Sequence, residues 1–357
     1  MVANENWENV RILGRTPVTD TGLDLIWSGS GVEFIFRGLE LGIKITGGDS
    51  VYQPWISLLV DGAWIMHMPV QEGTNKVMML KGLDPSTAHN IRIVKDTQAM
   101  PDDKDSFVIL NSLVYEGEIS KTPDYRYRIE FVGDSITSGE GLLGAHDAMD
   151  WISPYFSVEN HYGVMTAASL NAEYRLISQS GWGTVSAWDN NPYCTLPLVY
   201  ESTRCERGVC DNDFSCWSAD AVVINLGTND EGSFHTPEFI DPATGESYKL
   251  GLLDDGSYKP EDIRKVQEGV ISFLKTLRKD NPKAQLVWVY GMLGAGIGEY
   301  IKKAVEEYVS ATGDKKASYL ALPDTKEDGF GSRQHPGPVS HKNTSEVISA
   351  YLKQLLK

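Results

Sequence analysis

The residue pattern of this chain changes once, near residues 121–124, and that change restricts the fold more than any other feature. Before it, short apolar or alternating runs recur between turn residues, without an amphipathic helix. Several short strands at such spacing predict an all-β sandwich or jelly roll. After it, strand-like and helical stretches alternate, which predicts an α/β domain with a mainly parallel sheet. We therefore expect two domains, residues 1–122 and residues 123–357.

The first region has its strongest signal at residues 55–60, a β-prone run that ends at the hairpin dipeptide Asp61-Gly62. Residues 32–36 and 41–45 alternate between apolar and polar side chains. The first of these runs stops at Gly38 and the second at Gly47-Gly48, so we expect separate strands. Further strands are expected over residues 75–80, 90–94 and 107–110.

The second region contains mostly apolar runs at residues 221–226 and 285–290, as expected of parallel strands buried on both faces. Residues 127–132 and 174–178 also have strand character. Pro260 marks the first turn of a long amphipathic helix, and Asn281-Pro282 stops it. Further helices are expected over residues 159–170, 297–309 and 342–356.

The composition excludes several classes of partner. The formal net charge is −17 in 357 residues, which argues against nucleic acid and against an anionic membrane surface. No apolar stretch is long enough to cross a bilayer. The N-terminus lacks the pattern of a secretory signal, so the sequence as written predicts a cytoplasmic protein, or an extracellular one if a leader has been removed. The sequence makes no prediction of the oligomeric state.

The four cysteines all lie within residues 194–216. No pair is spaced as Cys-x-x-Cys and no histidine lies among them, so we expect no zinc site. A local disulfide would need an oxidising compartment. Because no signal peptide is seen, we favour free thiols over a disulfide. The cysteines concerned are Cys194, Cys205, Cys210 and Cys216.

Polar or Gly-rich segments follow three of the strands expected in the second region. They contain Ser135, Gly181 and Asn229, and a fourth segment, His335-Pro336, precedes the last helix. In an open α/β sheet the segments after the strands face one crevice, so these residues are expected to converge. Each segment alone would be an ordinary turn, cap or loop. Their order and spacing together point to a site.

These residue types suit ester hydrolysis. A hydroxyl such as that of Ser135 becomes nucleophilic when a base removes its proton, and a neutral imidazole from His335 can do this near neutral pH. Attack on an ester carbonyl creates an oxyanion. The backbone N–H groups of Ser135 and Gly181 and the side-chain amide of Asn229 would be three donors for it.

The ordered set resembles the SGNH hydrolases, also called GDSL esterases. The matching blocks are Gly133-Asp134-Ser135, then Gly181, then Gly227-Thr228-Asn229-Asp230, then His335-Pro336. The resemblance implies a flavodoxin-like, three-layer domain with a mainly parallel sheet. It covers about residues 126–357.

A β-sandwich placed before such a domain resembles carbohydrate esterase family 2 more specifically. Supporting phrases are Gly14-Arg15-Thr16, Val60-Asp61-Gly62 and the stretch from Ile129 to Gly139. The resemblance then covers essentially the whole chain. It implies an esterase that removes O-acetyl groups from plant-cell-wall polysaccharides such as xylan or mannan, without a metal or a cofactor.

The sequence departs from the superfamily pattern before His335. An Asp two or three residues earlier would orient the histidine, but here those positions are Arg333 and Ser332. A main-chain carbonyl near Arg333 or Gln334 could accept the Nδ1–H of His335, and we favour this interpretation. Alternatively, one of three acidic residues could fold back onto the histidine: Asp324, Glu327 or Asp328.

Three tryptophans lie near the expected site. Trp182 follows Gly181, so its ring is a candidate for stacking on a sugar, whereas Trp188 and Trp217 are expected to be core or loop anchors. A carbohydrate deacetylase is the leading interpretation. One alternative is a lipid or thioester hydrolase of the same superfamily. Another is a carbohydrate-binding protein whose hydrolase domain is inert.

Overall fold

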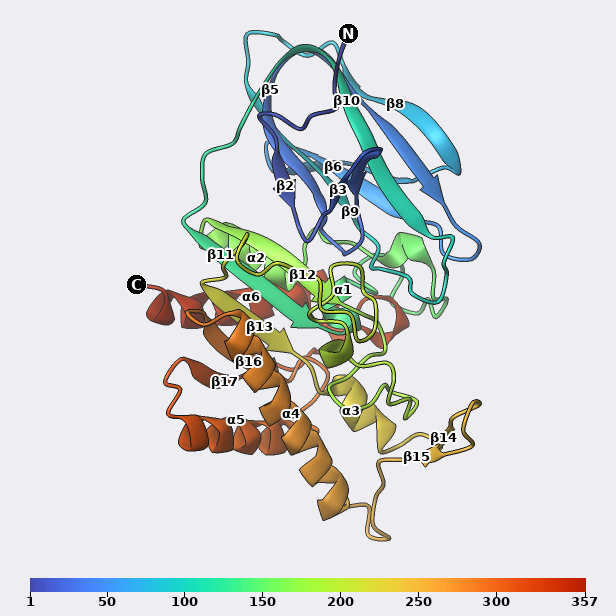
Figure 1. Ribbon diagram of the computed structural model, residues 1–357, viewed down its shortest axis with the longest axis vertical. Coiled ribbons are helices and arrows are strands. Elements are labelled where there is room, and N and C mark those ends of the chain that lie inside the picture. Colours follow the sequence, from blue (N-terminus) through green and yellow to red (C-terminus); the bar gives the residue numbers. More distant parts are fainter. The chain divides into compact units, whose positions relative to one another are not determined.

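The computed structural model describes residues 1–357, which group into two units (Figure 1). Unit 1 contains Met1–Tyr125 together with two short later segments, Asp150–Glu159 and Thr203–Cys205. Unit 2 contains the remainder: Arg126–Met149, Asn160–Ser202 and Glu206–Lys357. The structure contains no disulfide among the four cysteines.

Unit 1 is all-β, as the sequence pattern predicts, and contains ten strands that pair in an antiparallel manner. The strands are β1 (Val2–Asn4), β2 (Arg11–Leu13), β3 (Val18–Thr19), β4 (Gly22–Asp24), β5 (Gly31–Gly48), β6 (Trp55–Val60), β7 (Ala63–Pro69), β8 (Gly73–Lys81), β9 (His89–Lys95) and β10 (Phe107–Ser120). The hairpin between β6 and β7 turns at Asp61 and Gly62, with φ of +52° and +81°. Two successive left-handed residues are what a tight hairpin needs, which explains the Asp-Gly signal.

The two strands expected over residues 32–36 and 41–45 are one strand, β5. Its first half pairs with β9 and its second half with β8, while β10 runs along both. Gly38 does not end the strand. A Cβ there would lie 2.2 Å from the carbonyl oxygen of Glu116 on β10, so glycine permits a close approach where the register shifts.

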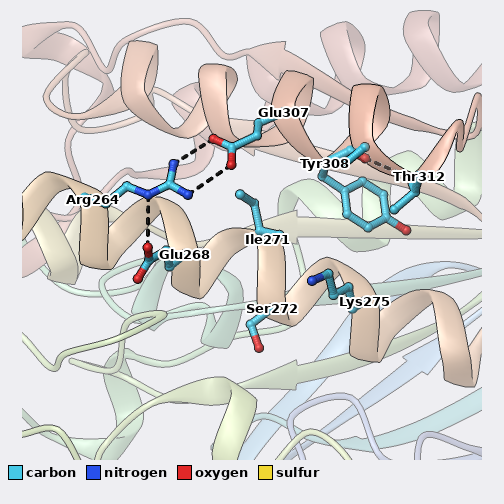
Figure 2. A pocket seen from close by; sticks show the side chains of 9 residues that line it. Arg264, Glu268, Ile271, Ser272, Lys275, Glu307, Tyr308 and Thr312 are labelled. Carbon is cyan, nitrogen blue, oxygen red and sulfur yellow. Dashed lines mark hydrogen bonds and ion pairs between the residues drawn. The ribbon is translucent and has the colours of Figure 1, made fainter.

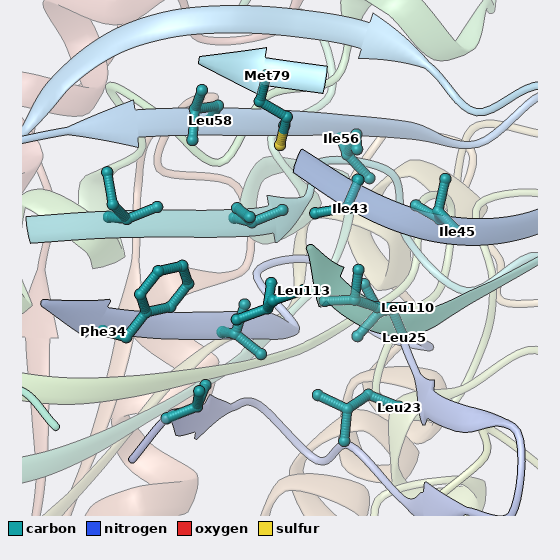
Figure 3. Packing of buried hydrophobic residues seen from close by; sticks show 14 of the residues in the cluster. Leu23, Leu25, Phe34, Ile43, Ile45, Ile56, Leu58, Met79, Leu110 and Leu113 are labelled. Carbon is teal, nitrogen blue, oxygen red and sulfur yellow. The ribbon is translucent and has the colours of Figure 1, made fainter. Parts of the chain in front are cut away.

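The core of unit 1 is a continuous cluster of aliphatic and aromatic side chains contributed by most of its strands. Figure 3 shows Phe34, Ile43, Leu58, Leu110 and their neighbours directed toward one another. Each of these four side chains is fully buried or nearly so. Alternation along the strands thus places one face of each strand in this core.

The two later segments are tied to unit 1 by specific contacts. The indole Nε1 of Trp27 donates to the carbonyl of Thr203 at 2.9 Å. The buried carboxylate of Asp96 accepts from the backbone N–H of Val158 at 3.1 Å. Residues distant in sequence therefore complete the surface of the β-sandwich.

Unit 2 contains a five-stranded parallel sheet with the order β12-β11-β13-β16-β17. Its strands are β11 (Tyr127–Gly133), β12 (Ala172–Ser178), β13 (Ala221–Asn225), β16 (Gln285–Tyr290) and β17 (Ala317–Ala321). The sequence did not reveal β17, because this edge strand is only partly buried and lacks a long apolar run. A short hairpin, β14 (Phe239–Ile240) with β15 (Ser247–Tyr248), lies outside the sheet.

The helices of unit 2 pack in two pairs, α2 with α6 and α4 with α5. Their bounds are α1 (Ser135–Ser138), α2 (Tyr162–Ser169), α3 (Thr228–Ser233), α4 (Pro260–Asp280), α5 (Gly298–Thr312) and α6 (Pro338–Leu355). Single-turn helices occur at η1 (Ser153–Tyr155) in unit 1 and at η2 (Leu196–Leu198), η3 (Glu327–Gly329) and η4 (Ser332–Gln334) in unit 2. The chain places β12 on one side of β11 and the later strands on the other side. Because the crossovers between parallel strands are right-handed, the two helix pairs lie on opposite faces of the sheet.

These layers give the flavodoxin-like arrangement that the resemblance implies. The order in which strands are added reverses at β11, because β12 lies on one side of it and β13 on the other. Open α/β sheets bind their ligands at the carboxyl ends of the strands beside such a point. None of the helices combines the length and the apolar character that a bilayer-spanning segment needs.

The groove between α4 and α5 is lined largely by charged and polar side chains (Figure 2). Arg264 bridges the two helices, because its guanidinium pairs with Glu268 on α4 and with both carboxylate oxygens of Glu307 on α5.

Candidate active site

Strand β11 delivers Ser135 into a tight turn. After Gly133 the carboxylate of Asp134 caps α1 by accepting the N–H of Ile136 at 3.0 Å. A Cβ on Gly133 would lie 2.1 Å from Oγ1 of Thr137, so only glycine fits at the strand end. Because α1 starts directly at Ser135, its hydroxyl lies at the carboxyl edge of the sheet.

The structure brings Ser135 and His335 together. The Nε2 atom of His335 lies 2.8 Å from Oγ of Ser135, and its Nδ1 atom lies 2.9 Å from the carbonyl oxygen of Arg333. A carbonyl oxygen can only accept, so Nδ1 carries the hydrogen and Nε2 is left to accept from the serine hydroxyl. The local geometry thus selects the tautomer that a general base needs.

No acidic side chain occupies the orienting position. Asp324, Glu327 and Asp328 are all exposed, and none of them forms a hydrogen bond or ion pair with His335. The carbonyl of Arg333, one of the two interpretations left open by the sequence, is the partner found.

The carbonyl reaches the imidazole because the backbone turns through two left-handed residues. Arg333 has φ of +55° and Gln334 has φ of +58°. The N–H of Arg333 donates to the carbonyl of Ala148 at 2.7 Å, which fixes the turn from the other side. Non-glycine residues seldom adopt this conformation, so a strained turn held by its surroundings takes the position usually filled by an acid.

The three expected oxyanion donors follow three neighbouring strands whose ends lie in register. Gly133 at the end of β11 pairs with Ser178 of β12 and with Asn225 of β13. Ser135, Gly181 and Asn229 each follow one of these ends by two to four residues. The structure therefore places them at one edge of the sheet, as the sequence predicts.

Asn229 and Gly181 are held in place by their surroundings. The amide Nδ2 of Asn229 donates one hydrogen to the carbonyl of Trp182 at 2.9 Å, and its second hydrogen is available for another acceptor. Gly181 has φ of +79°, which favours glycine. Both residues therefore have conformations that the local structure determines.

Asp230 fixes the loop that follows Gly181 to helix α3. Its fully buried carboxylate accepts the backbone N–H groups of Thr184, Val185 and Ser186 at 2.8, 2.7 and 3.2 Å. Hydrogen bonds to an ionised acceptor are the stronger kind. The final residue of the Gly-Thr-Asn-Asp block thus positions the oxyanion loop relative to its neighbour Asn229.

Several buried titratable groups lie around the dyad. Burial raises the pKa of Asp134 to about 7, and the carboxylates of Asp230 and Glu140 act in the same direction. Burial would also raise the pKa of Glu140, but attraction to the protonated form of His335, a hydrogen bond from Ser180 and the Arg333 side chain together hold that pKa below its usual value.

Two further histidines, not assigned a role from the sequence, lie buried beneath the nucleophile turn. Burial lowers the pKa of His161 to about 3, and burial together with the neighbouring imidazoles lowers that of His341. The Nε2–H of His161 donates to the carbonyl of Ile136 at 3.1 Å, and Nδ1 of His341 accepts the N–H of Tyr162 at 3.0 Å. Both rings are neutral supports of the turn.

The tryptophans differ from their predicted roles. Trp182 is only 5% exposed and the guanidinium of Arg207 lies over its ring at 5.7 Å, so it has no open face for a sugar. The stacking role expected for it is therefore not supported. Trp188, expected to be an anchor, is 55% exposed and lies against Gly181, with Cδ1 3.0 Å from the position of a Cβ there. Trp217 is a buried anchor, since its Nε1 donates to Glu173 at 2.6 Å.

No three side chains of the His, Cys, Asp or Glu type gather in a way that could hold a metal ion. The groups described above are those available for chemistry: a hydroxyl, an imidazole with a fixed tautomer and a set of N–H donors. That set can form and break an acyl-enzyme.

The chain is similar to known proteins in sequence and in structure. Residues 12–123 match the model of the family described as "Carbohydrate esterase 2 N-terminal". The solved structure of an acetyl xylan esterase, Est2A from the rumen bacterium Butyrivibrio proteoclasticus, has a TM-score of 0.96 and 38% identity. That similarity covers 99% of this chain and 98% of the other.

Two curated relatives are more distant in sequence. Cellulase/esterase CelE of Acetivibrio thermocellus is 27% identical over 354 residues, covering 96% of this chain. The chain spans only 39% of the length of that protein. An acetylxylan esterase / glucomannan deacetylase of Cellvibrio japonicus is 22% identical over 361 residues, covering 98% of this chain and 89% of the relative.

Proposed function

This chain belongs to carbohydrate esterase family 2, and we propose that it is a serine esterase that removes O-acetyl groups from hemicellulose of the xylan or mannan type. The relatives named for acetyl xylan and for glucomannan support this substrate class. The observation that carries the proposal is the hydrogen bond between Ser135 and His335, with Nδ1 of the histidine fixed by a carbonyl.

The reaction begins with attack of Ser135 on the acetyl carbonyl carbon. Nε2 of His335 takes the hydroxyl proton as the Oγ–C bond forms, and the carbonyl oxygen becomes an oxyanion. Backbone N–H groups of Ser135 and Gly181 and the amide of Asn229 are the donors for this oxygen. Loss of one such donor typically costs about 3–4 kcal/mol of transition-state stabilisation.

Collapse of this intermediate breaks the bond to the sugar oxygen. His335 returns the proton to that oxygen, which releases the deacetylated saccharide and leaves acetyl-Ser135. A water molecule, deprotonated by His335, then attacks the acetyl group by the same route in reverse. Acetate leaves and Ser135 regains its proton.

Trp188 is the aromatic side chain we assign to saccharide contact in place of Trp182. It is the exposed ring beside Gly181, so its face is open next to the expected position of the reacting group. Aromatic rings combine a large apolar face with a polar edge, which suits a sugar ring.

Two other functions remain to be tested against this one. A lipid or thioester hydrolase would prefer long acyl chains, so an aryl octanoate would be cleaved faster than an aryl acetate. A carbohydrate-binding protein with an inert hydrolase domain would bind xylan but would not be labelled at Ser135 by an organophosphonate.

The decisive experiment is a screen for acetate release from acetylated xylan, acetylated glucomannan and peracetylated monosaccharides. The matched control is Ser135→Ala, which removes the nucleophile and keeps the fold. We expect release from at least one polysaccharide and none from the variant. Equal release by the variant would refute the assignment of Ser135.

A further inference from the structure

The Ser135–His335 dyad has a neutral group at Nδ1, and this leaves an electrostatic problem. When His335 takes the serine proton it becomes an imidazolium cation. In a Ser-His-Asp triad the carboxylate both orients the ring and stabilises this cation. The carbonyl of Arg333 orients the ring through its 2.9 Å hydrogen bond, but it carries no net charge. A negative charge elsewhere near the ring would complete the site.

Glu140 provides such a charge. It is 2% exposed, and its Oε1 atom lies 3.8 Å from Nε2 of His335. Its backbone N–H donates to the carbonyl of Ser135 at 3.0 Å, which ties it to the nucleophile turn. The carboxylate therefore lies beside the nitrogen that receives the proton, whereas the Arg333 carbonyl lies at the other ring nitrogen.

The same carboxylate holds the residue that orients the ring. Its Oε1 accepts the Nε–H of Arg333 at 2.8 Å, and the Nη1 group of Arg333 donates to the carbonyl of Met149 at 2.8 Å. These bonds fix the side chain of a residue whose backbone is left-handed. The carbonyl of that residue is the partner of Nδ1. Glu140 therefore acts on both nitrogens of His335: on Nε2 through its charge, and on Nδ1 through its bond to Arg333.

We propose that Glu140 is a positioning residue that replaces the missing triad acid: its buried negative charge stabilises the His335 imidazolium, and its bond to Arg333 holds the orienting carbonyl. This inference rests on the proposed function only in that both use the Ser135–His335 dyad. The identity of the acyl group and of the sugar does not enter it.

Other charged or titratable groups face the same region. Arg333 carries the opposite charge and partly neutralises Glu140. Asp134 lies at the nucleophile turn and interacts with Glu140. His341 on α6 interacts with His335 but is buried and neutral, and His161 beside it is neutral also. Glu140 is thus the carboxylate in ion-pair range of His335.

The test measures how fast an organophosphonate modifies Ser135 as a function of pH, in the full-length protein. This readout needs the activated serine but no acetylated substrate. An opposite charge within about 4–6 Å shifts a titration by about 1–3 units, and Arg333 reduces the effect here. In Glu140→Gln, which keeps an acceptor for Arg333, we expect the midpoint of the acid limb to move down by about one pH unit. The plateau rate should fall by roughly ten-fold.

Two further variants separate charge from anchoring. Glu327→Gln removes one negative charge from the exposed loop before His335 and should leave the profile unchanged. Arg333→Met removes the neutralising cation and the anchor but keeps the carboxylate, so its midpoint should move up. If Glu140→Gln does not fold, the Arg333→Met profile decides alone, and an unmoved midpoint there overturns the proposal.

A slower Glu140→Gln protein whose midpoint equals that of the wild type would also overturn the electrostatic role. The function fails separately: a wild-type protein that is labelled at Ser135 but releases no acetate refutes the deacetylase proposal and leaves the Glu140 result intact. Absence of labelling in the wild type would refute both.

Discussion

Gly141 offers the sharpest test of the site geometry. Its φ is +78°, and a Cβ added there would lie 2.6 Å from the Cβ of His335 and 2.6 Å from the carbonyl oxygen of Ser332. Ordinary contact at such a position begins at 3.4 Å. Gly141→Ala must therefore push the His335 loop away by about 0.8 Å, the difference between these distances.

The expected loss follows from this displacement. A misplacement approaching 1 Å can cost a reaction about 10²-fold in rate. The hydrogen bond between His335 and Ser135 is 2.8 Å long, so an added 0.8 Å would take it beyond hydrogen-bonding range. We expect kcat for an aryl acetate to fall by about 100-fold. The left-handed backbone adds about 1–2 kcal/mol of destabilisation.

The control is Gly256→Ala, because Gly256 has φ of +82° and no atom within 4 Å of its Cβ position. It carries the same backbone strain without the clash, so it should lose stability but retain kcat. The assay compares initial rates of acetate release at saturating substrate, with thermal unfolding to show that each variant is folded. Equal kcat values for the two variants would refute the reasoning.

Three further predictions concern other parts of the chain. Trp188→Ala should raise KM for acetylated oligosaccharides more than for an aryl acetate, whereas Trp182→Ala should destabilise the fold by about 3–5 kcal/mol, because a buried ring is lost. Burial and the Asp96 carboxylate raise the pKa of Glu159 from 4.5 to about 7, so the native state keeps a proton that the unfolded chain has released. The free energy of unfolding should therefore fall as the pH rises from about 4.5 to about 7, and Glu159→Gln should remove up to about 1.4 kcal/mol per pH unit of that slope in urea titrations. The exposed acids before His335 are Asp324, Glu327 and Asp328. Replacing each of them singly by Ala should change kcat by less than about two-fold, since none contacts the histidine.

The sequence reveals most of the α/β unit because its strands are buried on both faces. Strand β16 occupies residues Gln285–Tyr290, as predicted, and helix α4 starts at the predicted Pro260. Edge strand β17 escaped detection, since one side of it is open and its residues need not be apolar. In the β-sandwich, Gly38 suggested the end of a strand at a position where strand β5 in fact continues. A glycine marks both a turn and a close approach of two strands, and sequence alone does not separate them.

The tryptophans illustrate a second limit. Adjacency to Gly181 favoured Trp182 as the exposed ring, but the chain folds so that Trp188 returns to that glycine: the N–H of Trp188 donates to the Gly181 carbonyl at 3.0 Å. Which of two rings in one loop faces solvent depends on such tertiary contacts. Residue type predicts that an aromatic side chain lies near the site, and only the loop conformation determines which one is exposed.

The dyad shows the same limit at the level of chemistry. Ser135, Gly181 and Asn229 could be found from the sequence because each follows a recognisable strand by a short distance. The partner of Nδ1 is a backbone carbonyl, a group that every residue has, so no residue type could reveal it. The structure reveals it through two consecutive left-handed residues, Arg333 and Gln334.

A site without the orienting acid has to obtain orientation and charge from different groups. The Arg333 carbonyl gives orientation, since it lies 2.9 Å from Nδ1. Glu140 can give charge, since it lies 3.8 Å from Nε2 and is buried, where water weakens the interaction least. The bond between Arg333 and Glu140 couples the two tasks. Restoring an acid at Nδ1 would therefore not simply add to activity. The new carboxylate would lie near Glu140 and would compete with the carbonyl for the same hydrogen. Arg333→Asp should therefore fall below the wild-type rate, although it restores the acid that the superfamily pattern contains.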